Sequence, residues 1–319
     1  MQQSGALESG KKATVAERAR MMRLAGYASV GVAFLLIGAK VAAYLLTGSV
    51  ALLSSLLDSL LDAGASLVNL YAIRQSLTPA DREHRFGHGK AEPLAALGQT
   101  AFIAGSAAFL AFQAVGRLIA PVPVEHEELG IAVMVFSIVA TLLLVLYQRR
   151  VIRRTGSFAV RADSLHYLGD LFVNASVIVA LLLSAWWGWH IADPLFAIGI
   201  AAYILYTAWQ IFRSALDMLM DRELPDEMRG RIRKIALNHP RVMSVHDLRT
   251  RAAGRSIFVQ MHLEMDPEML LREAHEVADA VELAIMAEFP GAEVIIHEDP
   301  AGIEEPRKPF ERPAAARRV

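Results

Sequence analysis

Long apolar runs, each about as long as a helix that crosses a bilayer, occupy the chain from Leu24 to Phe212. A spanning helix needs about 20 mostly apolar residues. Five runs meet this length: Leu24–Leu46, Leu94–Val115, Leu129–Tyr147, Leu171–Trp189 and Pro194–Phe212. A sixth run, Gly48–Ile73, is as long but contains two aspartates. The pattern predicts six transmembrane helices, which place both termini on one side of the membrane.

Basic residues gather in every second connection between these runs. The amino-terminal tail and the connections after the second and fourth runs are rich in Arg and Lys, whereas the alternate connections are nearly free of charge. Cytoplasmic connections carry an excess of Lys and Arg, so we expect both termini in the cytoplasm. Residues 1–20 are polar, which predicts a tail without a cleavable signal peptide. Lys40, inside the first run, is interpreted as a side chain that snorkels to the membrane surface.

The composition changes at Asp221 to that of a soluble domain. The pattern predicts the order helix, strand, strand, helix, strand over Pro225–Asn238, Val242–Thr250, Ser256–Met265, Leu270–Phe289 and Glu293–His297. This αββαβ order suits a small α+β domain with an antiparallel sheet. We expect a transmembrane domain over residues 21–220, the soluble domain over 221–302, and a disordered tail rich in Pro, Arg and Glu over 303–319.

The composition limits the class of protein and the kinds of metal site that the chain can form. The 319 residues are 54% hydrophobic and 20% charged, which fits a membrane part joined to a soluble part. A formal net charge of -1 argues against a nucleic-acid binder, because such domains are usually basic. The chain has no cysteine, which excludes disulfides, thiolate zinc sites and iron–sulfur clusters. Any metal must therefore be held by His, Asp or Glu.

Acidic residues inside the apolar runs are the strongest functional signal. Asp58 and Asp62 lie four residues apart, as do His166 and Asp170, so each pair shares one face of a helix. A carboxylate near the bilayer centre costs at least ~2.5 kcal/mol, so such residues usually have a role. Three carboxylates and one imidazole can hold a divalent transition metal in tetrahedral geometry. The alternatives are hydrogen bonds between helices, or a position of His166 and Asp170 near the cytoplasmic helix end.

Two further clusters of metal-binding residue types lie outside the apolar runs. Asp81, His84 and His88 occupy the connection after the second run, where Gly87 and Gly89 predict a bend rather than a helix. The soluble domain carries His246, His262, His275, His297 and Asp299, of which the last two point the same way from an extended chain. Taken alone, these residues also fit a hydrated polar loop and ordinary surface histidines.

Several motifs resemble those of the cation diffusion facilitators. The segments Asp58–Asp62 and His166–Asp170 are similar to the paired DxxxD and HxxxD motifs of that family, and further similarity lies in Pro79–Glu92, Asp221–Glu227 and His246–Arg251. The resemblance extends from about Arg20 to about Pro300. It implies a homodimeric, proton-coupled exporter of divalent metal, with six helices and a metallochaperone-like cytoplasmic domain.

The resemblance also implies roles for individual residues. It assigns a transport site to Asp58, Asp62, His166 and Asp170, a second metal site to Asp81, His84 and His88, and a pair of ions at the dimer interface to His246, His262, His275, His297 and Asp299, with Asp247 as a bridging neighbour. Lys90 and Asp221 match residues that form ion pairs near the membrane surface and hold the dimer together.

These observations together predict a zinc-exporting metal/proton antiporter of the bacterial inner membrane, which works by alternating access and is not an enzyme. Ferrous iron, cadmium and manganese suit the same ligands, and zinc is expected both as substrate and as regulatory ligand, with no catalytic cofactor. The other expected partners are protons, membrane lipid and a second copy of the chain. The alternatives are a membrane-anchored metal sensor or scaffold, a metallohydrolase and a channel. No zincin-like or triad motif supports the hydrolase, and a tight tetrahedral site holds an ion too firmly for conduction.

Overall fold

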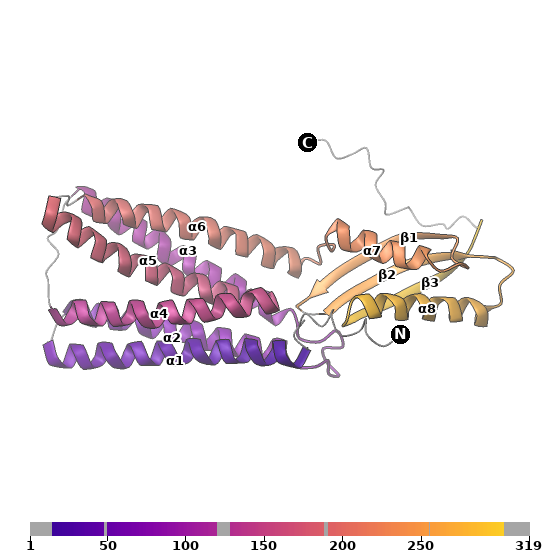
Figure 1. The fold of residues 1–319 in the computed structure, drawn as a ribbon, viewed down its shortest axis with the longest axis horizontal. Coiled ribbons are helices and arrows are strands. Elements are labelled where there is room, and N and C mark those ends of the chain that lie inside the picture. Colours follow the sequence, from indigo (N-terminus) through magenta and orange to yellow (C-terminus); the bar gives the residue numbers. More distant parts are fainter. Residues whose placement is uncertain (1–14, 48–49, 120–127, 188–190, 255, 303–319) are drawn as a thin grey trace, which may run out of the picture. The chain divides into compact units, whose positions relative to one another are not determined.

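The computed structural model describes residues 15–47, 50–119, 128–187, 191–254 and 256–302 (Figure 1). The chain divides into two compact units, Met1–Leu216 and Asp217–Val319. Most of the predicted amino-terminal tail and the whole predicted tail over 303–319 lie outside the described residues, as do most residues of the connections expected to be outside the cell.

The first unit is a bundle of six helices. They are α1 (Val15–Thr47), α2 (Val50–Ser76), α3 (Ala91–Ile119), α4 (Glu128–Thr155), α5 (Phe158–Trp187) and α6 (Ala192–Leu219). Five of them, α1, α2, α3, α4 and α6, contain among the described residues a stretch that is long and apolar enough to cross a membrane. α5 has 30 residues and carries Arg161, Asp163 and Asp170 in its first half. Most of the helices extend past the predicted apolar runs by polar turns, and α5 begins well before its run.

α5 is placed by contacts at its beginning and along its length. Glu92, in the first turn of α3, is buried and accepts hydrogen bonds from Ser157 Oγ and from the backbone N–H of Ala159. Ser157 Oγ also accepts from the N–H of Val160 at 3.2 Å, so it caps the helix. An anion at a helix amino terminus is favourable because of the helix dipole. These contacts fix where α5 starts relative to α3.

Small side chains let the helices approach each other closely. Alanines of α3, α5 and α6 form one buried cluster, with Ala96, Ala162 and Ala215 all at 0% exposure. A Cβ added to Gly169 of α5 would lie 3.0 Å from Cδ1 of Ile204 in α6. Close packing at small residues is the usual basis of helix association in membranes.

The second unit is an α+β fold. It contains α7 (Asp226–Leu237), β1 (Ser244–Ala253), β2 (Ser256–Met265), α8 (Leu271–Glu288) and β3 (Ala292–Pro300), in the predicted order. The sheet has the order β1-β2-β3. In β2 the alternate residues Val259, Met261 and Leu263 are buried in a core that also contains residues of α7 and α8.

The expected antiparallel sheet is wrong in one respect. β1 and β2 pair antiparallel, but β2 and β3 pair parallel. The reason is the connection: β2 leads into α8, and a helical crossover returns the chain to the same end of the sheet from which β2 started. The parallel register sets His262 beside His297 and Glu264 beside Asp299.

Candidate metal centre

Three of the four residues expected inside the membrane form a compact cluster. Asp62 of α2 and His166 and Asp170 of α5 each offer a ligand atom, and these atoms lie within 4.8 Å of one another. The Nε2 atom of His166 is 2.9 Å from Oδ1 of Asp62 and 3.8 Å from Oδ2 of Asp170. This buried nitrogen makes no hydrogen bond of acceptable geometry among the described residues. It is therefore aimed at a point between the carboxylates, as a metal ligand would be.

Asp58 stands at the edge of this cluster. It lies one turn before Asp62 on α2 and is outside the group of ligand atoms that meet within 4.8 Å. With Asp62 and Asp170 it lines two cavities, of about 350 and 170 Å³. The larger is bounded by α2, α3, α5 and α6, and the smaller by α1, α2, α4 and α5. The three carboxylates thus form a wall shared by two spaces.

The loop between α2 and α3 brings its three expected residues together. Asp81 Oδ2 lies 3.4 Å from Nε2 of His88, and Oδ1 lies 3.5 Å from Nδ1 of His84. Gly87 has a φ of 76°, which confirms the predicted bend. Oδ1 of Asp81 also accepts hydrogen bonds from the backbone N–H groups of His84 and Glu83. These bonds, with that of His84 dominant, hold the pKa of the carboxyl below its usual value.

In the second unit, one carboxylate joins histidines of all three strands. Oδ2 of Asp299 lies 2.7 Å from Nδ1 of His262 and 3.4 Å from Nε2 of His246. Oδ1 of Asp299 lies 3.2 Å from Nε2 of His297. His275 of α8 is not part of this group, because its ring nitrogens lie 3.7 Å from Asp279 and Glu298 instead. The ligand atoms of His246, His262 and Asp299 therefore lie within 4.8 Å of one another, and His297 lies against the other oxygen of Asp299.

The remaining expected residues are not members of these groups of ligand atoms. Lys90 directly precedes α3 in the first unit, and Asp221, in the second, lies 3.5 Å from the guanidinium of Arg251. Their expected ion pair stays a prediction. Asp247 forms part of the bulge in β1, with a φ of 48°, and its carboxylate lies 3.7 Å from Arg249.

Comparison with known proteins places these clusters in a family. A family model for the cation efflux transmembrane domain matches residues 27–220, and one for the cytoplasmic domain of cation efflux proteins matches residues 224–301. The chain belongs to the cation efflux family. The cation-efflux pump FieF of Escherichia fergusonii is 50% identical over 284 residues, which cover 89% of this chain and 94% of that protein. FieF of Escherichia coli K12 gives the same figures.

A solved structure of CzrB in its Zn form is 37% identical over 27% of this chain and 98% of that chain, with a TM-score of 0.25. Membership of the cation efflux family identifies the chain as a membrane-spanning transporter that exports metal cations. It also confirms the predicted fold class, a helical membrane domain followed by an α+β cytoplasmic domain.

Two charged residues of this cation efflux protein were missed or misread in the sequence. Lys40 does not snorkel: its Nζ donates hydrogen bonds to Ser59 Oγ at 2.6 Å and to the carbonyl oxygen of Ser55 at 3.0 Å. It lines the smaller cavity beside Asp58, Asp62 and Asp170. Its position well inside an apolar run was the available signal.

Asp163, one turn before His166, is the second charged residue whose role was missed in the sequence. Asp163 is 1% exposed, and its carboxylate accepts hydrogen bonds from four other helices. The donors are Ser29 Oγ at 2.5 Å, Gln148 Nε2 at 2.7 Å, Gln99 Nε2 at 3.2 Å and Ser66 Oγ at 3.5 Å. Asp163 lies before the predicted apolar run of α5, so its burial was not visible in the pattern. It connects α1, α2, α3 and α4 to the helix that carries two of the cluster residues.

Proposed function

We propose that the protein is a zinc-exporting metal/proton antiporter of the bacterial inner membrane, with cytoplasmic termini and a homodimeric assembly. The observation that carries this proposal is the convergence of Asp62, His166 and Asp170 within 4.8 Å inside the helical unit. With Asp58 as the fourth ligand, the set supplies one nitrogen and three oxygens. Such a mixed set suits zinc in tetrahedral geometry, while cadmium, ferrous iron and manganese remain competitors.

Proton exchange follows from the ligand chemistry. Carboxylates and imidazole bind either a proton or a metal ion, so metal binding displaces protons and acidification releases metal. The two cavities that share the carboxylate wall supply spaces on either side of it. A rocking movement that opens one route and closes the other would provide alternating access to one fixed site.

The histidine cluster of the second unit is proposed to regulate transport. Zinc bound to His246, His262, His297 and Asp299, with His275 from the same or a second copy, would hold two cytoplasmic domains together. Because zinc would favour the paired state, a rise in cytoplasmic zinc would increase the population that transports. The loop site at Asp81, His84 and His88 is proposed as a weaker zinc site.

The test is transport by the purified full chain in liposomes. A pH gradient is imposed, and zinc, cadmium, ferrous iron and manganese are compared with a fluorescent reporter inside. We expect zinc flux that depends on the gradient and is lost in Asp62→Asn, whereas Asp279→Asn, which alters an exposed carboxylate of the second unit, retains it. Zinc binding without any flux would instead support the sensor or scaffold.

A further inference from the structure

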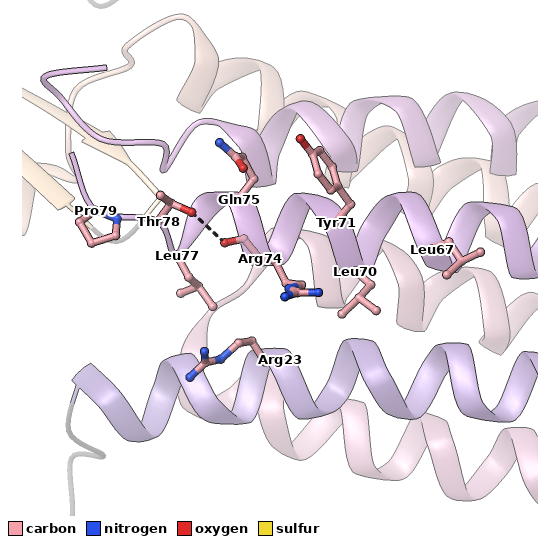
Figure 2. Close-up of a pocket in the computed structure, with 9 residues that line it drawn as sticks. All are labelled: Arg23, Leu67, Leu70, Tyr71, Arg74, Gln75, Leu77, Thr78 and Pro79. Atoms are coloured by element: carbon pink, nitrogen blue, oxygen red, sulfur yellow. Dashed lines mark hydrogen bonds between the residues drawn. The ribbon is translucent and has the colours of Figure 1, made fainter. Parts of the chain in front are cut away.

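Two arginines share one pocket between α1 and α2, at the end of the bundle where α2 leads into the loop. The pocket has a volume of about 690 Å³ and is lined by Arg23 of α1 and by Arg74, Gln75 and Thr78 of the α2 end. Figure 2 shows the guanidinium of Arg74 between the two helices, and that of Arg23 along the side of α1 that faces α2. Thr78 Oγ1 donates to the carbonyl oxygen of Arg74 at 3.3 Å, which holds the turn at this edge.

The pocket lacks a counter-charge of its own. Among the residues that the structure describes, no acidic side chain pairs with Arg23 or Arg74, and no acidic residue lines the pocket. Arg23 directly precedes the apolar run that starts at Leu24, and Arg74 directly follows the run that ends at Ile73. Both positive charges therefore stand at the edge of the hydrocarbon layer, where lipid phosphate groups lie.

The rest of the lining is apolar. Leu67, Leu70 and Tyr71 continue the pocket along α2 into the apolar run. Leu67 is 46% and Tyr71 70% exposed, so this face is available to a hydrocarbon chain. We propose that the pocket binds an anionic phospholipid, with its phosphate between Arg23 and Arg74 and an acyl chain along Leu67 and Tyr71. Arginine is suited to this role because its planar fork binds phosphate oxygens in pairs.

The test is lipid titration of the full chain in detergent, followed by native mass spectrometry. Phosphatidylglycerol should bind more tightly than phosphatidylcholine. Arg23→Gln/Arg74→Gln should weaken phosphatidylglycerol binding about thirtyfold, because each charge accounts for about fivefold. The matched control is Arg149→Gln/Arg150→Gln, two exposed arginines near the end of α4, which should bind as wild type. Arg23→Lys/Arg74→Lys keeps both charges. It replaces the first variant in the lipid titration if that variant folds poorly.

Three outcomes would overturn the lipid site. One is an equal loss in the Arg149/Arg150 control, because attraction would then be diffuse. Another is equal binding of the two lipids by the wild type. The third is displacement of phosphatidylglycerol by inorganic phosphate at the same concentration, because the pocket would then bind a free anion rather than a lipid.

A separate inference concerns the charge of the smaller cavity. This inference rests on the proposed transport function. Lys40 lines this cavity together with Asp58, Asp62 and Asp170. Three ionised carboxylates and one ammonium leave a formal charge of two negative units, which a divalent cation cancels. The ammonium is held by Ser55 and Ser59 of α2; Ser55 lies three residues before Asp58, and Ser59 directly follows it. The structure assigns Lys40 as a built-in counter-charge that matches the site to a divalent ion and permits its release.

A variant without this charge should bind metal more tightly, which a merely structural residue would not do. In a full chain with His84→Ala and His262→Ala, which weaken the other clusters, Lys40→Met should lower the zinc dissociation constant about tenfold. Zinc turnover in liposomes should fall together with KM, because release becomes slower. Lys40→Arg keeps the charge and should retain wild-type affinity within about threefold.

The outcomes separate the two proposals. Unchanged or weaker zinc binding in Lys40→Met, with a wild-type background that binds zinc, would overturn the role of Lys40 alone. Absence of zinc binding in the background chain itself would overturn the proposed transport site and the role of Lys40 with it.

Discussion

Oδ2 of Asp299 lies 2.7 Å from Nδ1 of His262, a contact between the last strand and the middle strand of the sheet. The contact exists because β3 runs parallel to β2, which sets Asp299 beside Glu264 and His297 beside His262. A single carboxylate thereby reaches histidines on all three strands. This side chain is only 11% exposed, so its charge is compensated mainly by those rings and by any metal they hold.

We expect Asp299→Ala to abolish the response of the soluble unit to zinc. The unit has its own hydrophobic core, so residues 221–302 should fold alone and dimerise more strongly with zinc. Loss of Asp299 should weaken zinc binding at least about tenfold, because even removal of a supporting partner of a ligand has that effect. Sedimentation across micromolar zinc measures both properties. Asp279→Ala is the control, and an unchanged mass distribution of the wild type would contradict the expectation.

His166→Asp should change metal preference rather than abolish transport. Replacing the imidazole nitrogen by a carboxylate oxygen gives an all-oxygen site, which favours harder ions such as manganese over zinc. Initial transport rates for zinc, cadmium and manganese in liposomes, each relative to wild type, would reveal the change. The same ranking of metals in both proteins would show that His166 does not set selectivity.

Asp163→Leu should destabilise the membrane unit. It removes the acceptor of four buried donors and leaves them without that partner; they are Ser29, Ser66, Gln99 and Gln148. We expect a loss of about 2 kcal/mol in the free energy of unfolding, since hydrogen bonds to a charged group are worth about 1.5–3 kcal/mol. Thermal unfolding in detergent provides the measurement. The control is Ser137→Ala, whose hydroxyl donates only within its own helix; a similar loss there would argue against a special role for Asp163.

The loop carboxylate should titrate at unusually low pH. The backbone N–H groups of His84 and Glu83 lower the pKa of Asp81, so the folded value lies below the ordinary ~3.9. The stability that this turn contributes is therefore fully present above that ordinary value and is lost as the pH falls through the depressed one. Carboxyl ¹³C resonances of aspartate-labelled protein, assigned with Asp81→Asn, would follow the titration. A midpoint at or above the ordinary value would refute the turn as its cause.

The sequence predicted the helices, and it indicated residues that the structure brings together, because both depend on local pattern. Apolar runs of spanning length mark α1 to α6, and the spacing of four places Asp62 beside Asp58 and Asp170 beside His166 on their helices. The direction of β3 was not predictable in this way, because the αββαβ order fits more than one pairing. Only the packing of α8 against the sheet makes the parallel return necessary.

The sequence did not reveal the roles of Lys40 and Asp163, because these roles also depend on tertiary packing. Lys40 and Asp163 are each satisfied by groups on other helices, so their roles depend on contacts that no periodicity contains. An isolated lysine in an apolar run has a simple explanation in snorkelling, and only the positions of Ser55 and Ser59 exclude it. Likewise, Asp58 shares the spacing of its partners, yet it stands at the cavity wall rather than within the cluster.

The place of β3 in the chain also orders the events of biosynthesis. His297 and Asp299 lie on the last described element, so the ribosome completes them after every helix of the membrane unit. Asp62, His166 and Asp170 are already present in the growing polypeptide when the carboxylate that joins the cytoplasmic histidines is still to be translated. A messenger truncated before β3 would therefore encode every intramembrane acid of the chain but neither His297 nor Asp299 of the proposed cytoplasmic zinc site.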